Sequence, residues 1–504
     1  MGNEAESSQP PIVVMKFGGT SVQDAAAISR TIEIIHGRRN RKIRPVVVVS
    51  AMARVTDQLL AAAHAAVEND LPKAMLISNI LRNRHIETAA VLVGRKLAQL
   101  IHSLDELFDQ LDNVLTGIAA VGELTQRTSD LVVSFGERTS SIIVAQALEH
   151  RGISSLHVDA RQCIRTDAHF GKASPLQDET DAAVRELLLS VVQANAVPVL
   201  GGFIASTQTG ITTTLGRGGS DYSAALIGGA LNAQTIEIWT DVNGVMTTDP
   251  RICPNALRLR AISFEEASEL AYFGAKVLHP ATILPAVKKN IPVCVLNSHN
   301  PTNEGTVITA TATASSSPLK SIAVKRHLAI LHIVSRRLLV SHRFLRSVFE
   351  VLDRYDCSVN MLATSEISLS VAVDALEHLD AIRTDLSSIA TIQVEQNKAL
   401  LCLVGDHLRE QPGIAARACI AIRQTNLQMI SQGANGINIS FMVDETAIES
   451  AVSALHAEFF SDADPTLFDT SATAAHETVA LHGLPAWQAR DLPQRKAHTS
   501  PSLS

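Results

Sequence analysis

Two glycine-rich segments of the chain carry residue types suited to binding phosphate or carboxylate groups. Residues 16–21 are KFGGTS, and residues 216–221 are GRGGSD. Glycines let backbone N–H groups approach an anion closely, and a helix that begins at such a loop adds partial positive charge. Arg217 adds a guanidinium fork that suits a carboxylate or a phosphate. For the second segment alone, a turn in which Asp221 caps a helix is about as good an explanation.

Lys16 favours the anion-binding interpretation. It lies at the end of a short apolar run, residues 12–17, just before Gly18 and Gly19. A lone lysine can also be tolerated on an edge strand. A lysine at the carboxyl end of a strand, next to a glycine nest, is better explained as a phosphate ligand.

Polar side chains follow two other apolar runs. Four valines at 46–49 predict a parallel strand buried on both faces, which places Ser50 and Thr56 at the sheet edge where α/β proteins bind ligands. Turn formation or capping would explain each hydroxyl alone. The run 131–135 predicts a strand that leads into Glu137. That acid could pair with a substrate ammonium group, or it could stabilise the first turn of a helix.

The remaining pattern of residues 12–310 alternates strands and helices. Helical periodicity covers 57–117, and strands are predicted at 155–159, 197–202, 235–240 and 291–297. The strand at 235–240 runs into a loop rich in turn residues, a good place for a nucleotide. This alternation predicts an α/β domain with a parallel sheet.

Composition narrows the class of protein. At roughly 100–200 residues per domain, 504 residues predict about three domains. A net charge of −7 argues against a general nucleic-acid role. The six cysteines form no CxxC pair, and no apolar run reaches the length of a membrane span. With no basic and apolar leader at the N-terminus, the sequence predicts a cytoplasmic protein.

From residue 319 the sequence changes character. Strand and helix patterns follow the order β-α-β-β-α twice, which indicates an internal repeat of about 70 residues. From Ser461 the chain is rich in Ala, Ser, Thr, Pro and His, and we expect a tail with little structure.

The chain has no Walker A motif, and no GxGxxG follows a strand, so neither a P-loop enzyme nor a Rossmann dehydrogenase is indicated. Five ordered motifs instead resemble the aspartokinases of the amino-acid kinase family, over residues 12–460. They are KFGGTS at 16–21, SFGE at 134–137, TLGRGGSD at 214–221, WTD at 239–241 and GAKVLHP at 274–280.

The resemblance implies a fold and its domains. The catalytic domain, 10–310, would be a three-layer αβα amino-acid kinase fold with a largely parallel open sheet. Two ferredoxin-like (βαββαβ) ACT domains that sense amino acids would follow at 319–395 and 396–460, and 461–504 would be a disordered tail.

The resemblance also implies the reaction, phosphorylation of the L-aspartate side chain by ATP with Mg²⁺. A carboxylate with a pKa of roughly 4 is already ionised and needs no general base. The difficulty is that two negative groups must meet, which lysines, backbone N–H groups and Mg²⁺ relieve.

Individual roles follow from the same resemblance. Lys16 would contact the transferring phosphoryl group, and Asp221 would hold that lysine. Arg217 would bind the α-carboxylate of aspartate, and Glu137 its ammonium group. The residues that would position aspartate, cradle phosphates or line the nucleotide site are, in chain order, Gly18, Gly19, Ser50, Thr56, Gly218, Gly219, Thr240, Asp241, Asp249, Arg251 and Lys276.

An effector site resembling that of lysine-inhibited aspartokinases is implied in the first ACT domain. Its residues are Ser341, Phe344, Leu345, Asn360, Ser365 and Glu366. Arg343 stands where a glycine is common and Asn360 where an aspartate often binds the effector, so capture of a diamino acid should be weaker. Lysine is the expected effector; threonine, a combination of effectors or lost regulation are alternatives. ACT domains pair between chains, which implies a homodimer or tetramer.

Two other functions remain open from the sequence. One is a different amino-acid kinase, acting on glutamate, acetylglutamate or a nucleoside monophosphate. The other is a non-catalytic amino-acid sensor, which is disfavoured because Lys16, Asp221 and Lys276 are all present.

Overall fold

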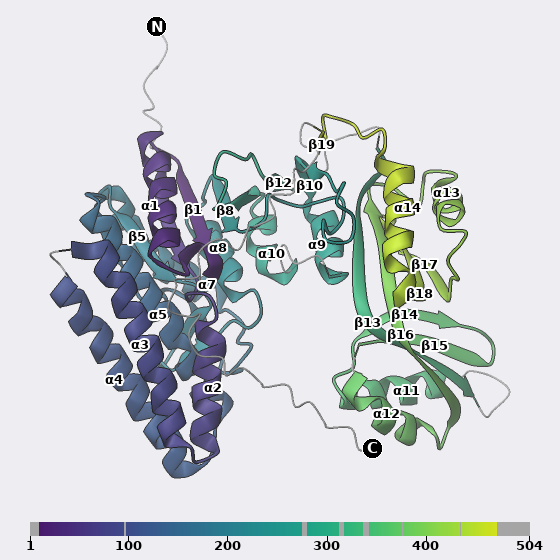
Figure 1. The fold of residues 1–504 in the computed structure, drawn as a ribbon, viewed down its shortest axis with the longest axis horizontal. Coiled ribbons are helices and arrows are strands. Elements are labelled where there is room, and N and C mark those ends of the chain that lie inside the picture. Colours follow the sequence, from purple (N-terminus) through teal and green to yellow (C-terminus); the bar gives the residue numbers. More distant parts are fainter. Residues whose placement is uncertain are drawn as a thin grey trace, which may run out of the picture.

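The computed structural model describes residues 10–94, 97–274, 280–311, 317–335, 342–374, 376–433 and 435–470. The N-terminal part is built on an eight-stranded sheet in the order β10-β12-β11-β8-β1-β2-β5-β3 (Figure 1). Its strands are β1 (Ile12–Phe17), β2 (Arg44–Val49), β3 (Ser155–His157), β5 (Val197–Gly201), β8 (Thr235–Thr240), β10 (Ala261–Ser263), β11 (Val293–Asn297) and β12 (Thr306–Thr309). Neighbouring strands are parallel except β11 and β12, as the largely parallel prediction requires.

Alternate residues of β1 enter two different cores, which gives the expected three layers. Val13, Met15 and Phe17 pack against helices on one face, and Val14 packs on the other. The first face is covered by α1 (Ala25–Asn40), α3 (Leu71–Val93), α4 (Leu97–Val121) and α5 (Gln126–His150). The second is covered by α7 (Gln177–Gln193), α8 (Gly219–Ala230), α9 (Phe264–Tyr272) and α10 (Pro280–Lys288).

The strand predicted at 131–135 is wrong, because these residues lie inside the 25-residue helix α5. Thr125 caps that helix by accepting a hydrogen bond from the N–H of Thr128. Every residue from Val132 to Glu137 is buried, so the segment lacks the amphipathic period that marks a surface helix. A short apolar run cannot distinguish a buried strand from a buried helix.

Small elements fill the edges of this domain. They are η1 (Gly19–Val22), α2 (Val55–Val67), α6 (Ala160–Cys163), β4 (Arg165–Thr166), β6 (Ile204–Thr207), β7 (Thr212–Thr214) and β9 (Arg258–Leu259). Helix α2 packs with α3, α4 and α5 in a separate helical cluster, which agrees with the helices predicted over 57–117.

The C-terminal module is one six-stranded sheet in the order β14-β15-β13-β16-β18-β17. Its strands are β13 (Leu319–Ser335), β14 (Val359–Thr364), β15 (Ser368–Val373), β16 (Ala390–Gly405), β17 (Met429–Gln432) and β18 (Asn438–Asp444). Its helices are α11 (His342–Arg354), η3 (Leu376–His378), α12 (Leu379–Leu386), α13 (Ile414–Ala421), η4 (Glu445–Ala447) and α14 (Ile448–Phe460).

The long strands β13 and β16 each serve two ferredoxin-like units. The second half of β13 pairs with β15 and the first half of β16, whereas residues 319–325 pair with the second half of β16. Register shifts between Lys325 and Ile330 separate the halves of β13. The second unit therefore also includes residues 319–325, which precede the first unit in the chain. The prediction that the second unit begins at residue 396 is wrong in this respect.

The tail expected from Ser461 is also wrong for its first ten residues. Strand β19 (Phe468–Asp469) pairs antiparallel with β9 of the N-terminal domain. Leu467 and Phe468 are fully buried, so two apolar side chains of a polar segment join the protein core. Residues 471–504 lie outside the described part of the chain. Among the described helices, none has the length and apolar character needed to cross a membrane.

Candidate active site

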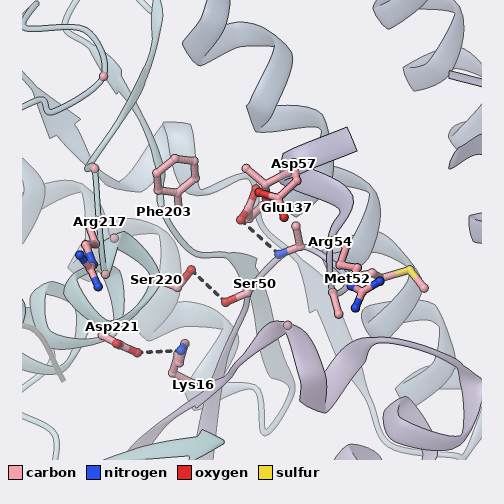
Figure 2. Close-up of a pocket in the computed structure, with 18 residues that line it drawn as sticks. Lys16, Ser50, Met52, Arg54, Asp57, Glu137, Phe203, Arg217, Ser220 and Asp221 are labelled. Atoms are coloured by element: carbon pink, nitrogen blue, oxygen red, sulfur yellow. Dashed lines mark hydrogen bonds and ion pairs between the residues drawn. The ribbon is translucent and has the colours of Figure 1, made fainter. Parts of the chain in front are cut away.

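A cavity of about 570 Å³ lies at the carboxyl ends of β1, β2 and β5 (Figure 2). The edge of a parallel sheet is where the sequence placed the site. Its walls come from the segments after these strands, from α5 and from the start of α8. Nine predicted site residues line it: Lys16, Gly19, Ser50, Thr56, Glu137, Arg217, Gly218, Gly219 and Asp221.

Lys16 and Asp221 form an ion pair across the cavity, with 2.7 Å between Nζ and Oδ1. Both side chains are only slightly exposed, at 12% and 13%. Asp221 lies in the first turn of α8, which begins at Gly219 after the N-cap residue Gly218. The pair places one cation beside a helix N-terminus, which is a favourable setting for phosphate.

The glycines of 216–219 are required by backbone geometry and by space. Gly216 and Gly218 both have φ of +73°. A Cβ on Gly219 would lie 2.7 Å from the ring of Phe203. Arg217, between them, is exposed and lies on the Asp221 side of the cavity, opposite Glu137 (Figure 2).

Glu137 is the unusual group of the cavity. Its side chain is buried, and Oε1 accepts a hydrogen bond from the N–H of Ala51 at 3.1 Å. Oε2 has no partner among the described residues. Burial raises the pKa of this carboxyl from 4.5 to about 8. Gly136 allows this approach, since a Cβ there would lie 2.8 Å from that of Ala51.

Hydroxyl groups connect the two sides of the cavity floor. Ser50 Oγ donates to Ser220 Oγ at 3.0 Å, so the end of β2 touches the start of α8 (Figure 2). Thr56 lies in the first turn of α2 and is half-buried. Gly19 packs tightly under this floor, because a Cβ there would lie 3.0 Å from the carbonyl oxygen of Ala51.

The other predicted nucleotide ligands lie outside the lining of this cavity. The N–H of Gly18 donates to the carbonyl of Trp239, which brings the ends of β1 and β8 together. Thr240 is the last residue of β8, and its Oγ1 donates to Oδ1 of Asp241 at 3.1 Å. Asp249 and Arg251 form an ion pair at 2.6 Å in the following loop. Lys276 lies outside the described residues.

Several lining residues were not predicted: Ala51, Met52, Ala53, Arg54, Asp57, Gly171, Phe203 and Ser220. Phe203 follows two glycines and has φ of +67°, a strained value that only the folded chain reveals. Gly171 is held by Asp130, which accepts hydrogen bonds from Gly171 N, Thr214 N and Thr214 Oγ1. Ser220 stood inside the GRGGSD motif, so that motif could have indicated it.

The predicted effector residues spread over the first ferredoxin-like unit. Phe344 is part of its core, and Leu345 packs against that core. Asn360 on β14 accepts a hydrogen bond from Lys325 Nζ at 2.6 Å. Ser365 and Glu366 form the turn between β14 and β15, where Ser365 Oγ bonds to Ser368 Oγ. Ser341 lies outside the described residues.

Comparisons with known proteins agree with this architecture. Residues 11–297 match the model of the amino acid kinase family, and residues 401–459 match an ACT domain model. Aspartokinase 1, chloroplastic, of Arabidopsis thaliana is 38% identical over 467 residues, covering 90% of this chain and 80% of its own. The chain belongs to the aspartokinases. Lysine-sensitive aspartokinase 3 of Escherichia coli is 36% identical, over 89% of this chain and 99% of its own.

Solved aspartokinases have the same fold. E. coli aspartokinase III in complex with aspartate and ADP gives a TM-score of 0.78 at 34% identity, covering 89% of this chain and all of that one. The same enzyme with lysine and aspartate gives 0.77. Membership of the aspartokinases sets aside the other amino-acid kinases as the family of this chain.

Proposed function

We propose that the chain phosphorylates the side-chain carboxylate of L-aspartate with ATP, giving 4-phospho-L-aspartate and ADP. This is the first step toward the aspartate-derived amino acids lysine, threonine and methionine. One observation carries the proposal: a single cavity joins the Lys16–Asp221 pair to the unpartnered Oε2 of buried Glu137. A close relative was solved with aspartate and ADP.

The cavity can orient aspartate by its two charged α-groups. Glu137 Oε2 would accept the ammonium group, because an ionised carboxylate buried without a partner gains most from a cation. Arg217 at the rim would bind the α-carboxylate with its guanidinium fork. The side-chain carboxylate is then directed to the Lys16 side of the cavity.

Transfer forms a bond between a carboxylate oxygen and the γ-phosphorus and breaks the bond from that phosphorus to the β–γ bridging oxygen. ADP leaves with the electron pair, and no proton has to be removed. Lys16 offsets the charge that builds on the transferring group, and Asp221 fixes the direction of Nζ. N–H groups at the start of α8, after Gly218 and Gly219, add fixed partial positive charge.

Mg²⁺ fits this site as an ion that arrives with the nucleotide. Mg²⁺ in kinases takes one or two carboxylates and substrate phosphates, and the described residues contain no cluster of three His, Cys, Asp or Glu side chains. Asp221 is the carboxylate beside Lys16 and would be its protein ligand. When bound, the ion neutralises phosphate charge.

The nucleotide base and ribose would lie beyond Lys16, toward the end of β8. Thr240, Asp241, Asp249 and Arg251 belong to this side, and Lys276 follows α9 in sequence. The short distance from the end of β1 to the end of β8 supports this placement, since Gly18 N is 3.0 Å from Trp239 O.

Regulation by lysine through the ACT module belongs to the same proposal. The support is the lysine-sensitive relative and its complex with lysine. Pairing of two chains through ACT units, to a dimer or tetramer, stays a prediction. A cytoplasmic location also stays a prediction, because plant relatives are named chloroplastic.

The test is ADP release from Mg-ATP with L-aspartate, and separately with L-glutamate, each with and without lysine or threonine. We expect turnover that requires aspartate and falls when lysine is added. Turnover that is unaffected by both effectors would support the kinase activity and contradict the proposed regulation. A folded protein that binds lysine but shows no aspartate-dependent turnover would replace the kinase by an amino-acid sensor.

A further inference from the structure

The segment after the last ACT helix returns to the catalytic domain. We name residues 461–470 the C-terminal strap. It leaves α14 and crosses to the β10–β12 end of the large sheet (Figure 1). Phe468 stacks edge-on against Phe460 of α14, with 5.5 Å between ring centroids. Leu467 and Phe468 are 1% and 0% exposed, so these two side chains are buried as deeply as core residues.

Main-chain and charged contacts fix the strap on β9. Phe468 pairs with Leu259, and the N–H of Arg260 donates to the carbonyl of Leu467 at 2.8 Å. Asp469 Oδ2 lies 2.7 Å from Arg258 Nη2, and these side chains are 15% and 7% exposed. Burial of both partners makes this ion pair costly to break from one side.

The strand that the strap holds is the base of the loop after β8. The N–H of Leu259 donates to Val245 O, and the N–H of Thr247 donates to Leu257 O, both at 2.8 Å. Residues 245–247, β9 and β19 therefore form a small three-stranded ribbon. The loop that leaves this ribbon carries Asp249 and Arg251.

Helix α14 contacts the same loop directly. His456 Nε2 lies 2.9 Å from Thr247 Oγ1, and that oxygen also accepts the N–H of Leu257. The Thr247 hydroxyl can therefore donate to His456. The C-terminal strap and helix α14 therefore both contact the base of this loop.

We propose that the C-terminal strap positions the nucleotide-binding loop, with Asp469 and Phe468 as positioning residues that act through β9. This inference rests on the proposed function for the assignment of the loop to ATP. If the strap is released, the loop is ordered for only part of the time, and the apparent nucleotide affinity falls by that fraction. A loop ordered about one tenth of the time would weaken Mg-ADP binding roughly tenfold.

The experiment compares two truncations of the full chain. One ends at Phe460 and removes the strap, and the control ends at residue 470 and keeps it. Binding of Mg-ADP is measured by calorimetry, and KM for ATP and for aspartate by turnover. Hydrogen exchange of the amides of Thr247, Leu259 and Arg260 reports the ribbon without any ligand.

Point variants keep the test valid if the shorter truncation does not fold. Asp469→Asn removes the charge that faces Arg258, and Asp462→Asn changes an exposed acid of the same strap. We expect faster exchange of the ribbon amides and weaker Mg-ADP binding for the strap truncation and, to a smaller extent, for Asp469→Asn. The control truncation and Asp462→Asn should match the full chain.

The outcomes separate this inference from the proposed function. Unchanged hydrogen exchange and unchanged Mg-ADP affinity in Asp469→Asn and in the strap truncation would contradict the proposed positioning role of the strap. Faster exchange with unchanged Mg-ADP affinity would also overturn its role in nucleotide binding. If the full chain binds Mg-ADP but does not phosphorylate aspartate, the proposed function fails, and the binding comparison still decides on the strap.

Discussion

The catalytic cavity and the candidate effector surface differ in how their polar groups are satisfied. In the cavity, Glu137 Oε2 is buried and has no partner among the described residues. On the effector surface, Lys325 Nζ bonds Asn360 Oδ1 at 2.6 Å and pairs with Asp374 Oδ2 at 2.9 Å. The cavity thus retains an unsatisfied buried oxygen that a substrate can bond, whereas Asn360 of the effector site already bonds within the chain.

This difference has a thermodynamic meaning. An unpartnered buried acceptor destabilises the fold, and a ligand that satisfies it recovers that free energy as affinity. A surface whose groups already bond to each other must lose one interaction for each that it gains. We therefore expect strong dependence on aspartate contacts and weak dependence on effector contacts.

Loss of the Lys16 charge should have the largest effect on activity. In Lys16→Ala the transferring phosphoryl group loses its cation, and we expect kcat to fall by ~10²–10³-fold. Circular dichroism and thermal unfolding should show an intact fold. Lys73→Ala removes an exposed lysine of α3 and should leave kcat unchanged. Near-normal turnover in Lys16→Ala would remove the assigned role.

Replacing Glu137 by Gln tests the role of this carboxyl in two ways, through the KM for aspartate and through the pH dependence of kcat/KM. The neutral side chain cannot pair with an ammonium group, so KM for aspartate should rise by about tenfold or more. In the unchanged protein kcat/KM for aspartate should increase as pH rises through the Glu137 pKa of about 8, because only the ionised form binds the ammonium group. Glu137→Gln should flatten this profile.

The same variant should be more stable than the unchanged protein at pH 8. The folded protein keeps on Glu137 a proton that the unfolded chain loses near pH 4.5, so stability falls between pH 4.5 and about 8. At about 1.4 kcal/mol per pKa unit, removal of the charge should raise the free energy of unfolding by a few kcal/mol. Exposed Glu123→Gln is the control. A loss of stability in Glu137→Gln would contradict the buried-charge assignment.

Asn360→Asp tests the candidate effector site and should have the smallest effect of these substitutions. A carboxylate in place of the amide makes a charge-assisted contact with a diamino acid, worth about 1 kcal/mol more than a neutral one. Lysine inhibition should tighten by roughly fivefold, less if Lys325 keeps hold of the new carboxylate. Exposed Asn397→Asp serves as the control. An unchanged lysine response in a lysine-inhibited protein would exclude Asn360 from the effector site.

The sequence predicted six of the eight strands of the large sheet, because short apolar runs mark them. Lys16, Ser50 and Asp221 line one cavity, because Lys16 lies near the end of such a run, Ser50 follows one and Asp221 lies in the first turn of a helix. It failed at 131–135, where burial on nearly all sides hides the helical period. Glu137 therefore reaches the cavity from the middle of α5, rather than from a strand end.

The sequence motifs by themselves indicated the three-layer αβα fold, the glycine-rich loops and the candidate phosphate-binding residues. These features follow from local backbone geometry and side-chain chemistry. Tertiary structure alone decided which groups are unmatched. The burial of Glu137 by α5, the sharing of β13 between two units and the docking of Phe468 on β9 depend on contacts between residues far apart in the chain. Local sequence patterns carry no record of such contacts, whose free energy comes from burial and pairing in the folded chain.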